Sequence, residues 1–306
     1  MNSIERKDKK KLLFYICGVA FPVLQFVVFY VFVNFNSILM AFQKYDRLTN
    51  SYSFTLENFS AVWNSIFNNS TDSLGVAFLN SFKYYIVSTI FATGFNILFA
   101  NYIYKKNFGS KFFQVMLFLP KILSATVLAV VYNYLLNEGY TQIMMQVNGV
   151  KVDGLMGADK PFILIMIFTI WAGFGTGVLM YTSTMSGISK EVVESAELDG
   201  ITPLKELIYI TLPMIYPTLV TFMVVNFSSI FLNEMSLYLF NGYFMEDTKK
   251  MTIGYYLFRE ARWAQSRSEM NTFCYLSSFG LMLSAVAIPL TFGFKRFLEK
   301  IGPSFE

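Results

Sequence analysis

The chain has 306 residues, of which 55% are hydrophobic and 14% charged, and its mean hydropathy is +0.47. These values exclude an ordinary soluble globular protein and indicate a polytopic membrane protein. The net charge is only +4, and the sequence does not pair basic runs with exposed aromatic residues, so nucleic-acid binding is not expected.

Six apolar stretches are long enough to cross a membrane as helices. A hydrocarbon core about 30 Å thick requires roughly 20 apolar residues, and a helix satisfies its own backbone polar groups. The stretches are 12–33, 76–104, 112–136, 161–187, 214–240 and 271–294. The sequence therefore predicts an all-α fold with six transmembrane helices.

The distribution of lysine and arginine predicts the orientation of these helices. The basic residues gather in the N-terminal segment 1–11, in a loop after the second span and in the C-terminal tail, the last two containing Lys105, Lys106, Lys111, Lys295, Arg296 and Lys300. An excess of positive charge marks the cytoplasmic side. We therefore expect both termini in the cytoplasm, a multi-pass location in the inner (cytoplasmic) membrane, and one transmembrane domain over 12–306.

Several catalytic and cofactor signatures are missing. The sequence has no histidine and no G-x-x-x-x-G-K-[ST] loop, which removes the commonest general base and the usual phosphate cradle. An enzyme, a metal site and a bound cofactor are therefore not expected, and any ATP would be handled by a partner. The "GFGTG" stretch at 173–177 predicts close helix packing at Gly173 and Gly177 rather than a dinucleotide loop.

Ionisable residues within the spans are costly and need an explanation. Lys83 and Glu234 lie at similar depth and could pair, or the side chain of Lys83 could reach the interface by itself. Lys121 follows Pro120 directly, and its position depends on where the third span begins. The sequence leaves both alternatives open.

Two polar stripes are candidates for a substrate pathway. Asn226, Ser229 and Asn233 are spaced i, i+3 and i+7 in the fifth span, followed by Glu234, and a stripe of Thr169, Gly173 and Thr176 lies beside Trp171 in the fourth. Buried polar groups in a membrane line a cavity or bond to a neighbouring helix. The spacing fits sugar contact and interhelical hydrogen bonding alike.

The acidic stretch "ESAELDG" (194–200) lies in a loop, residues 188–213, that the parity of spans places in the cytoplasm. Ser189 is a candidate helix cap with Glu191 in the first turn, and Asp199-Gly200 suits a left-handed helix end. Thr202-Pro203 then starts a second helix, expected to end at Pro213 and Pro217. Because Glu191, Glu194 and Glu197 share one face, a basic partner is expected there.

The pattern Glu194-Ser195-Ala196, Gly200 and Ile210-x-Leu212-Pro213 resembles the EAA signature of the membrane (permease) subunits of bacterial binding-protein-dependent ABC importers. Ser195 stands where alanine is usual. The resemblance implies that Glu194, Ser195, Ala196, Asp199 and Gly200 belong to a coupling loop that docks on an ATPase subunit, with polar or ionic roles for Glu194 and Asp199 and the turn at Gly200.

The resemblance covers nearly the whole chain and is closest to carbohydrate permeases of the maltose and glycerol-phosphate type. The stretches 37–46, 54–63, 78–89 and 112–139 are similar to that family, whereas "NGYF" (241–244) replaces its usual Gly-Gly-Pro element. The implied partners are a second homologous permease, two ATPase subunits and an extracellular solute-binding protein.

The implied function is ATP-driven import of a carbohydrate, an oligosaccharide above all, by alternating access, with a polyol or a sugar phosphate as alternative substrates. The rival hypothesis is an ATP-independent secondary transporter, for which internal repeats and ion sites would be expected.

Overall fold

The computed structural model describes residues 11, 15–16, 18–67, 74–157, 161–242, 245 and 250–303. Most of the basic N-terminal segment and part of "NGYF" lie outside these residues. The chain forms two compact units, one of residues 1–65 and 263–284 and the other of residues 66–262 and 285–306. Each unit is described by itself.

The first unit contains a long apolar helix followed by a small hairpin. Residues Gly18–Ala41, including η1 (Phe26–Val31) and α2 (Phe32–Ala41), form the first candidate span. Strands β1 (Gln43–Asp46) and β2 (Ser51–Phe54) pair antiparallel, and α3 (Glu57–Phe67) follows. The side chain of Asn271 exchanges hydrogen bonds of 2.7 and 3.0 Å with the backbone of Tyr45. The two strands are an addition to the predicted all-α fold.

In the second unit, α4 (Gly75–Tyr104) packs along α8 (Phe162–Met185), and α5 (Ser110–Ile122) packs against another side of α8. Glycines of α8 allow this close approach. A Cβ added at Gly177 would lie 2.2 Å from Asn96 Nδ2, and one added at Gly175 would lie 2.9 Å from Leu117 O. Gly173 has no atom within 4 Å of such a Cβ, so of the predicted packing pair only Gly177 packs closely.

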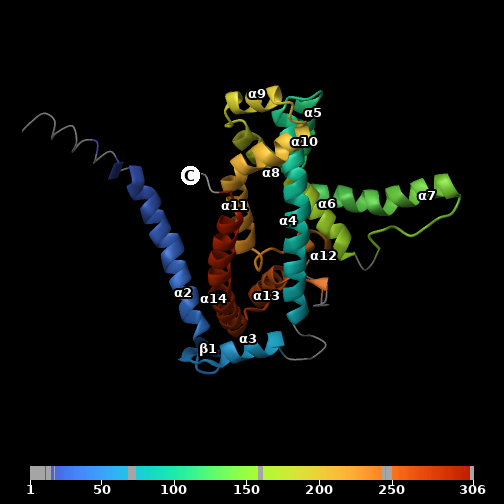
Figure 1. Ribbon diagram of the computed structural model, residues 1–306. Helices are drawn as coiled ribbons and strands as arrows, with labels where there is room; N and C mark the ends of the chain where they lie inside the picture. The colour runs from blue at the N-terminus through green and yellow to red at the C-terminus, as the bar shows by residue number, and fades with distance from the viewer. Residues whose placement is uncertain are drawn as a thin grey trace, which may run out of the picture. The chain divides into compact units, whose positions relative to one another are not determined.

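The third span, predicted over 112–136, is bent and extends beyond this range at both ends. Helix α5 is followed by α6 (Ala125–Tyr134), η2 (Leu135–Gly139) and α7 (Tyr140–Asn148), with a change of direction of 104° at the break. Leu123 and Ser124 are extended there, with ψ of 153° and 131°. Lys121 lies exposed in the last turn of α5. Figure 1 shows α7 projecting away from α4.

The fifth span also differs from the predicted range 214–240. Helix α10 (Pro203–Glu206), η3 (Leu207–Thr211) and α11 (Leu212–Ser228) form one helix that runs through Pro213 and Pro217. It ends at Ser228, and α12 (Leu237–Asn241) follows a turn in which Met235 and Ser236 have φ of 53° and 55°. Helix α11 therefore ends seven residues before these two left-handed residues, which lie at the start of α12 and keep α12 from continuing a helical path.

Helices α13 (Ile253–Arg267) and α14 (Met270–Ile301) complete the chain. Within the second unit, the ring of Phe227 stacks on Phe294 at 4.5 Å, and the Tyr216 hydroxyl donates to Leu298 O at 2.7 Å. These contacts join α11 to the C-terminal half of α14. Over the described residues five helices are long and apolar enough to cross a membrane, or six if the bent pair is one span.

Candidate functional site

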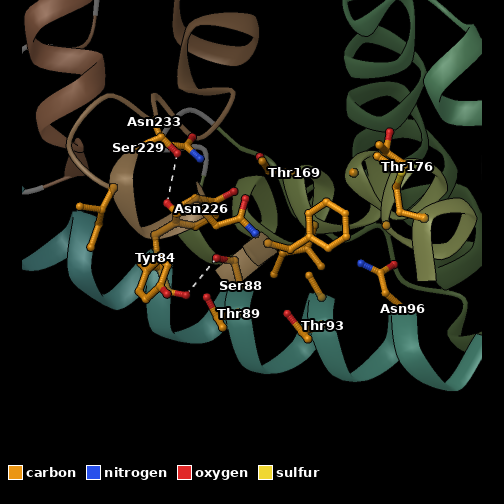
Figure 2. A pocket seen from close by; sticks show the side chains of 18 of the residues that line it. Tyr84, Ser88, Thr89, Thr93, Asn96, Thr169, Thr176, Asn226, Ser229 and Asn233 are labelled. Atoms are coloured by element: carbon orange, nitrogen blue, oxygen red, sulfur yellow. Dashed lines mark hydrogen bonds between the residues drawn. The ribbon is translucent and has the colours of Figure 1, made fainter. Parts of the chain in front are cut away.

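A cavity of about 290 Å³ opens between α4, α8 and the end of α11 in the second unit. Figure 2 shows polar side chains of α4 on one side and those of Asn226, Ser229 and Asn233 on the other. The polar lining consists of Tyr84, Tyr85, Ser88, Thr89, Thr93, Asn96, Thr169, Thr176, Tyr181, Asn226, Ser229 and Asn233. Hydroxyl and amide groups of this kind both donate and accept hydrogen bonds.

Besides the hydroxyl of Tyr181, four of these polar groups make no hydrogen bond within the described part of the chain. Two of them, Thr93 and Asn96, come from α4, Thr176 comes from α8, and Asn226 comes from α11. Asn96 is only 8% exposed, and its Oδ1 is buried without a partner. A buried unpaired polar atom costs about 1–3 kcal/mol, so a ligand that bonds to Asn96 would recover this cost. Thr93, Thr176 and Asn226 are half-buried or exposed, and their polar groups are also available to a ligand.

The stripe predicted in the fifth span reaches the cavity, although not on one helix. Asn226 lies on α11, whereas Ser229 and Asn233 follow its end. Ser229 Oγ already donates to Asn226 O at 3.1 Å, and Asn233 Oδ1 accepts from Met235 N at 2.8 Å. Asn233 therefore holds the turn after α11, and Asn226 is the free member of the three.

The stripe predicted in the fourth span also lines the cavity, since Thr169, Gly173 and Thr176 all face it. Thr169 Oγ1 donates to Ile165 O at 2.9 Å and lies 3.0 Å from Met235 O. Trp171 is not among the lining residues, and its ring lies 6.1 Å from that of Phe168. Half a turn along α8 from Thr169, Trp171 points to another face of the helix.

Glu234 and Lys83 do not form the suggested pair. Lys83 is exposed, and Glu234 Oε2 is buried without a hydrogen-bond partner among the described residues. Neither residue lines the cavity. The similar depth expected for Lys83 and Glu234 assumed that the fifth span is helical as far as Glu234. The helix ends at Ser228, so Glu234 does not lie on it.

The contribution of α4 to the cavity was not predicted. Tyr85, Thr89 and Thr93 lie at i, i+4 and i+8, and Asn96 continues this face. Polar residues at this helical spacing in an otherwise apolar span indicate a polar face on the helix, and this pattern could have predicted that α4 lines the cavity.

The acidic loop forms a compact helical hairpin, which we name the α9–α10 hairpin (residues 189–206). Helix α9 (Lys190–Leu198) ends in a Schellman motif, in which Gly200 N donates to Glu197 O at 3.0 Å and Ile201 N to Ala196 O at 3.2 Å. Gly200 has φ of +75°, as the sequence predicted. Figure 1 shows α9 and α10 at the same end of α4 as α5.

The start of each hairpin helix follows the predicted residues, with one difference. Thr202 precedes Pro203 at the first position of α10, as expected. Ser189 makes no capping bond to the backbone of α9 and donates instead to the carboxylate of Glu191.

The two faces of α9 differ in exposure. Ala196 is buried and Val193 half-buried, whereas Glu194, Ser195 and Asp199 are exposed and Leu198 is 90% exposed. The expected basic partner is Lys105, whose Nζ lies 3.4 Å from Glu197 Oε1. No such partner faces Glu194 among the described residues, so this carboxylate projects outward.

An apolar cluster joins the hairpin to the spans. It contains Ile97 and Ala100 of α4, Tyr181, Met185 and Ile188 at the end of α8, and Leu207 and Ile215 of the fifth span, with Val193 of α9 packed against it. Tyr181 meets Phe222 edge to face at 5.4 Å, and both rings also line the cavity. The cluster thus extends from the hairpin to the floor of the cavity.

The sequence pattern of the binding-protein-dependent transport system inner membrane components matches residues 92–305. The chain belongs to this family, that is, to the membrane subunits of ABC importers. The matched region contains the α9–α10 hairpin and two of the three helices around the cavity, together with the end of the third.

Similar individual proteins include two sugar or sugar-derivative permeases. The chain is 26% identical over 201 residues to the arabinooligosaccharides transport system permease protein AraP of Halalkalibacterium halodurans, covering 64% of this chain and 61% of the relative. It is 24% identical over 204 residues to the sn-glycerol-3-phosphate transport system permease protein UgpA of Shigella dysenteriae, covering 65% and 67%. The chain thus matches less than two thirds of the first relative's length.

Solved structures share the whole fold. A chain of a bacterial ABC transporter involved in the import of the acidic polysaccharide alginate superimposes with a TM-score of 0.76 at 17% identity, covering 99% of this chain and all of that one. An alginate transporter in complex with a pentasaccharide-bound periplasmic protein gives 0.75 at 18% identity, with 99% of each chain covered.

Proposed function

We propose that this chain is a permease subunit of an ATP-driven importer that moves an uncharged carbohydrate, an oligosaccharide in particular, across the cytoplasmic membrane by alternating access. The chain supplies a pathway and a docking element, and its partners supply ATP hydrolysis. The observation that carries this proposal is the apolar cluster that connects the polar cavity to an outward-facing acidic hairpin.

The α9–α10 hairpin is the proposed docking element for an ATPase subunit. Its buried face packs on the spans, and its exposed face presents Glu194, Ser195, Leu198 and Asp199 beside the turn at Gly200. Ala196 anchors the hairpin instead of contacting the partner, since it is buried in the isolated chain. A carboxylate projecting from a small, rigid turn suits a basic cleft on another protein.

The chemistry of the cavity supports a neutral substrate. Among the described residues that line it, no side chain is an acid, a lysine or an arginine. Moving a charge into such surroundings without a counter-ion costs several kcal/mol, whereas sugar hydroxyls match the free hydroxyl and amide groups of Thr93, Asn96, Thr176 and Asn226. An oligosaccharide or polyol therefore fits this half of the pathway better than a sugar phosphate.

The cavity volume of about 290 Å³ is at the lower end of the range of about 300–1,000 Å³ for small-molecule sites. A second homologous permease would complete a pathway wide enough for an oligosaccharide. A solute-binding protein would deliver the substrate from outside, and two ATPase subunits would dock at the cytoplasmic side. The excess of lysine and arginine in the loops supports a cytoplasmic position for the hairpin and both termini.

Uptake into proteoliposomes containing the purified importer distinguishes this function from secondary transport. We expect uptake of a labelled neutral oligosaccharide, presented with its binding protein, to require ATP on the side of the ATPase subunits and to continue when ionophores collapse all ion gradients. Uptake that needs an ion gradient and ignores ATP would establish the secondary transporter instead.

A further inference from the structure

A single ammonium group connects the end of α4 to both arms of the α9–α10 hairpin. Lys105 is the C-cap residue of α4, and its backbone N–H donates to Asn101 O at 3.0 Å. Its Nζ lies 2.6 Å from Glu206 Oε1 on α10 and 3.4 Å from Glu197 Oε1 on α9. The two carboxylates stand on either side of the turn at Gly200.

The environment of Glu206 makes the first of these contacts the stronger one. The Glu206 side chain is only 4% exposed, and its Oε1 has no well-aligned hydrogen-bond donor in the described part of the protein. The ammonium at 2.6 Å is therefore what compensates this carboxylate. Breaking a buried pair by removing one partner is strongly destabilising, because the other charge stays buried. The Glu197 contact is more exposed and contributes little.

Lys105 is also held in its charged form. Burial lowers its pKa, but the carboxylates of Glu206 and Glu197 outweigh this effect, so the pKa of Lys105 lies above its usual value. The position at the C-terminus of α4 favours a positive charge as well, since the helix dipole is negative there.

We propose that Lys105 and Glu206 are positioning residues whose ion pair fixes the α9–α10 hairpin to the end of α4. This inference rests on the proposed function, in which an ATPase subunit moves the hairpin. Helix α4 carries Thr93 and Asn96 into the cavity, so a hairpin fixed to α4 transmits its displacement directly to the substrate pathway. The apolar cluster alone holds the parts together but does not fix their direction, because the hydrophobic effect is non-directional.

The test uses the complete importer in proteoliposomes, with three readouts: retention of the ATPase subunits, basal ATP hydrolysis, and hydrolysis stimulated by the loaded binding protein. The variants are Lys105→Met, Glu206→Gln, the double variant and Lys105→Arg. Lys106→Met is the matched control, because this neighbouring lysine is exposed and forms no ion pair within the described residues.

We expect Lys105→Met and Glu206→Gln each to keep the ATPase subunits and basal hydrolysis while stimulation falls at least about fivefold, the lower end of typical coupling between sites. Lys105→Arg should restore most of the stimulation. The double variant should lose no more than one single variant, because the two residues act as one pair.

Stimulation in the single variants within about twofold of the Lys106→Met control overturns the proposal, and so do losses that multiply in the double variant. If Lys105→Met is not recovered as folded protein, Glu206→Gln and the double variant, which leave no uncompensated buried carboxylate, decide by the same criteria. Failure of the proposed function is seen separately, since the unmodified complex would then show no stimulated hydrolysis at all.

Discussion

The turn at Gly200 gives the sharpest prediction about the α9–α10 hairpin. Its φ of +75° is a conformation that costs other residues free energy, whereas a Cβ added there would meet no atom within 4 Å. The penalty of a substitution is therefore conformational and not steric. For an L-residue in this region it is about 1–2 kcal/mol, smaller for asparagine and larger for a β-branched residue.

A penalty of this size acts on a turn that contains two backbone hydrogen bonds, from Gly200 and Ile201 to Glu197 and Ala196. A change of about 1–2 kcal/mol alters a conformational population by about 5–30-fold. We expect substrate-stimulated ATP hydrolysis of the reconstituted importer to decline in the order Gly200→Asn, Gly200→Ala, Gly200→Val, with the valine variant losing most of it while still inserting in the membrane.

Gly149 is a matched control for this series. It ends α7 with φ of +68°, and a Cβ there would also meet no atom within 4 Å. Gly149→Val should therefore carry the same backbone penalty without touching the hairpin, and it should keep its stimulated hydrolysis. Normal stimulation in Gly200→Val, or an equal loss in Gly149→Val, would refute the assignment of the hairpin as the docking element.

Two further predictions concern the cavity. Asn226→Ala should raise the half-saturation concentration for uptake about fivefold, because one hydrogen bond to a buried ligand is worth about 1 kcal/mol, whereas Ser228→Ala, whose hydroxyl bonds to Val225 O outside the lining, should not change it. An unchanged half-saturation concentration in Asn226→Ala would indicate that this residue contributes to helix packing and not to substrate binding. Gly177→Ala should destabilise the protein by about 1–3 kcal/mol, since its Cβ would lie 2.2 Å from Asn96 Nδ2. Thermal unfolding in detergent should show the loss, its partial recovery on adding Asn96→Ala, and little effect of Gly173→Ala. A Gly177→Ala variant as stable as Gly173→Ala would contradict the close approach of α4 and α8.

The spans and the hairpin turn were predictable because their causes are local. Continuous apolar stretches of the required length predict spanning helices, and Asp199-Gly200 followed by Thr202-Pro203 predicts one helix end and one helix start. The end of the fifth span was missed because Ile230, Phe231 and Leu232 continue the apolar composition beyond Ser228. Apolar composition does not indicate that the backbone leaves the helical conformation at Ser229.

The cavity was only partly predictable, because its lining depends on which helices are neighbours. Asn226 and Thr176 were recognised as polar residues within spans, but Asn96 gains its importance from facing Gly177 across the α4–α8 contact. Likewise, the bend after Pro120 depends on extended residues at 123–124. A proline indicates that a helix is weakened but not how far the chain turns.

Cross-linking from a single exposed cysteine measures docking of the hairpin most directly. Leu198 is 90% exposed on α9, and Leu48 is 96% exposed between β1 and β2. Leu198→Cys and Leu48→Cys therefore form a matched pair, the first expected on the cytoplasmic side of the membrane and the second on the outer side. Both can be made with Cys17 replaced by serine and the buried Cys274 retained. A bifunctional reagent applied to the assembled importer should join Leu198→Cys, and not Leu48→Cys, to an ATPase subunit. An ATPase cross-link from Leu48→Cys, or none from Leu198→Cys in a complex that still hydrolyses ATP on addition of substrate, would contradict the proposed function.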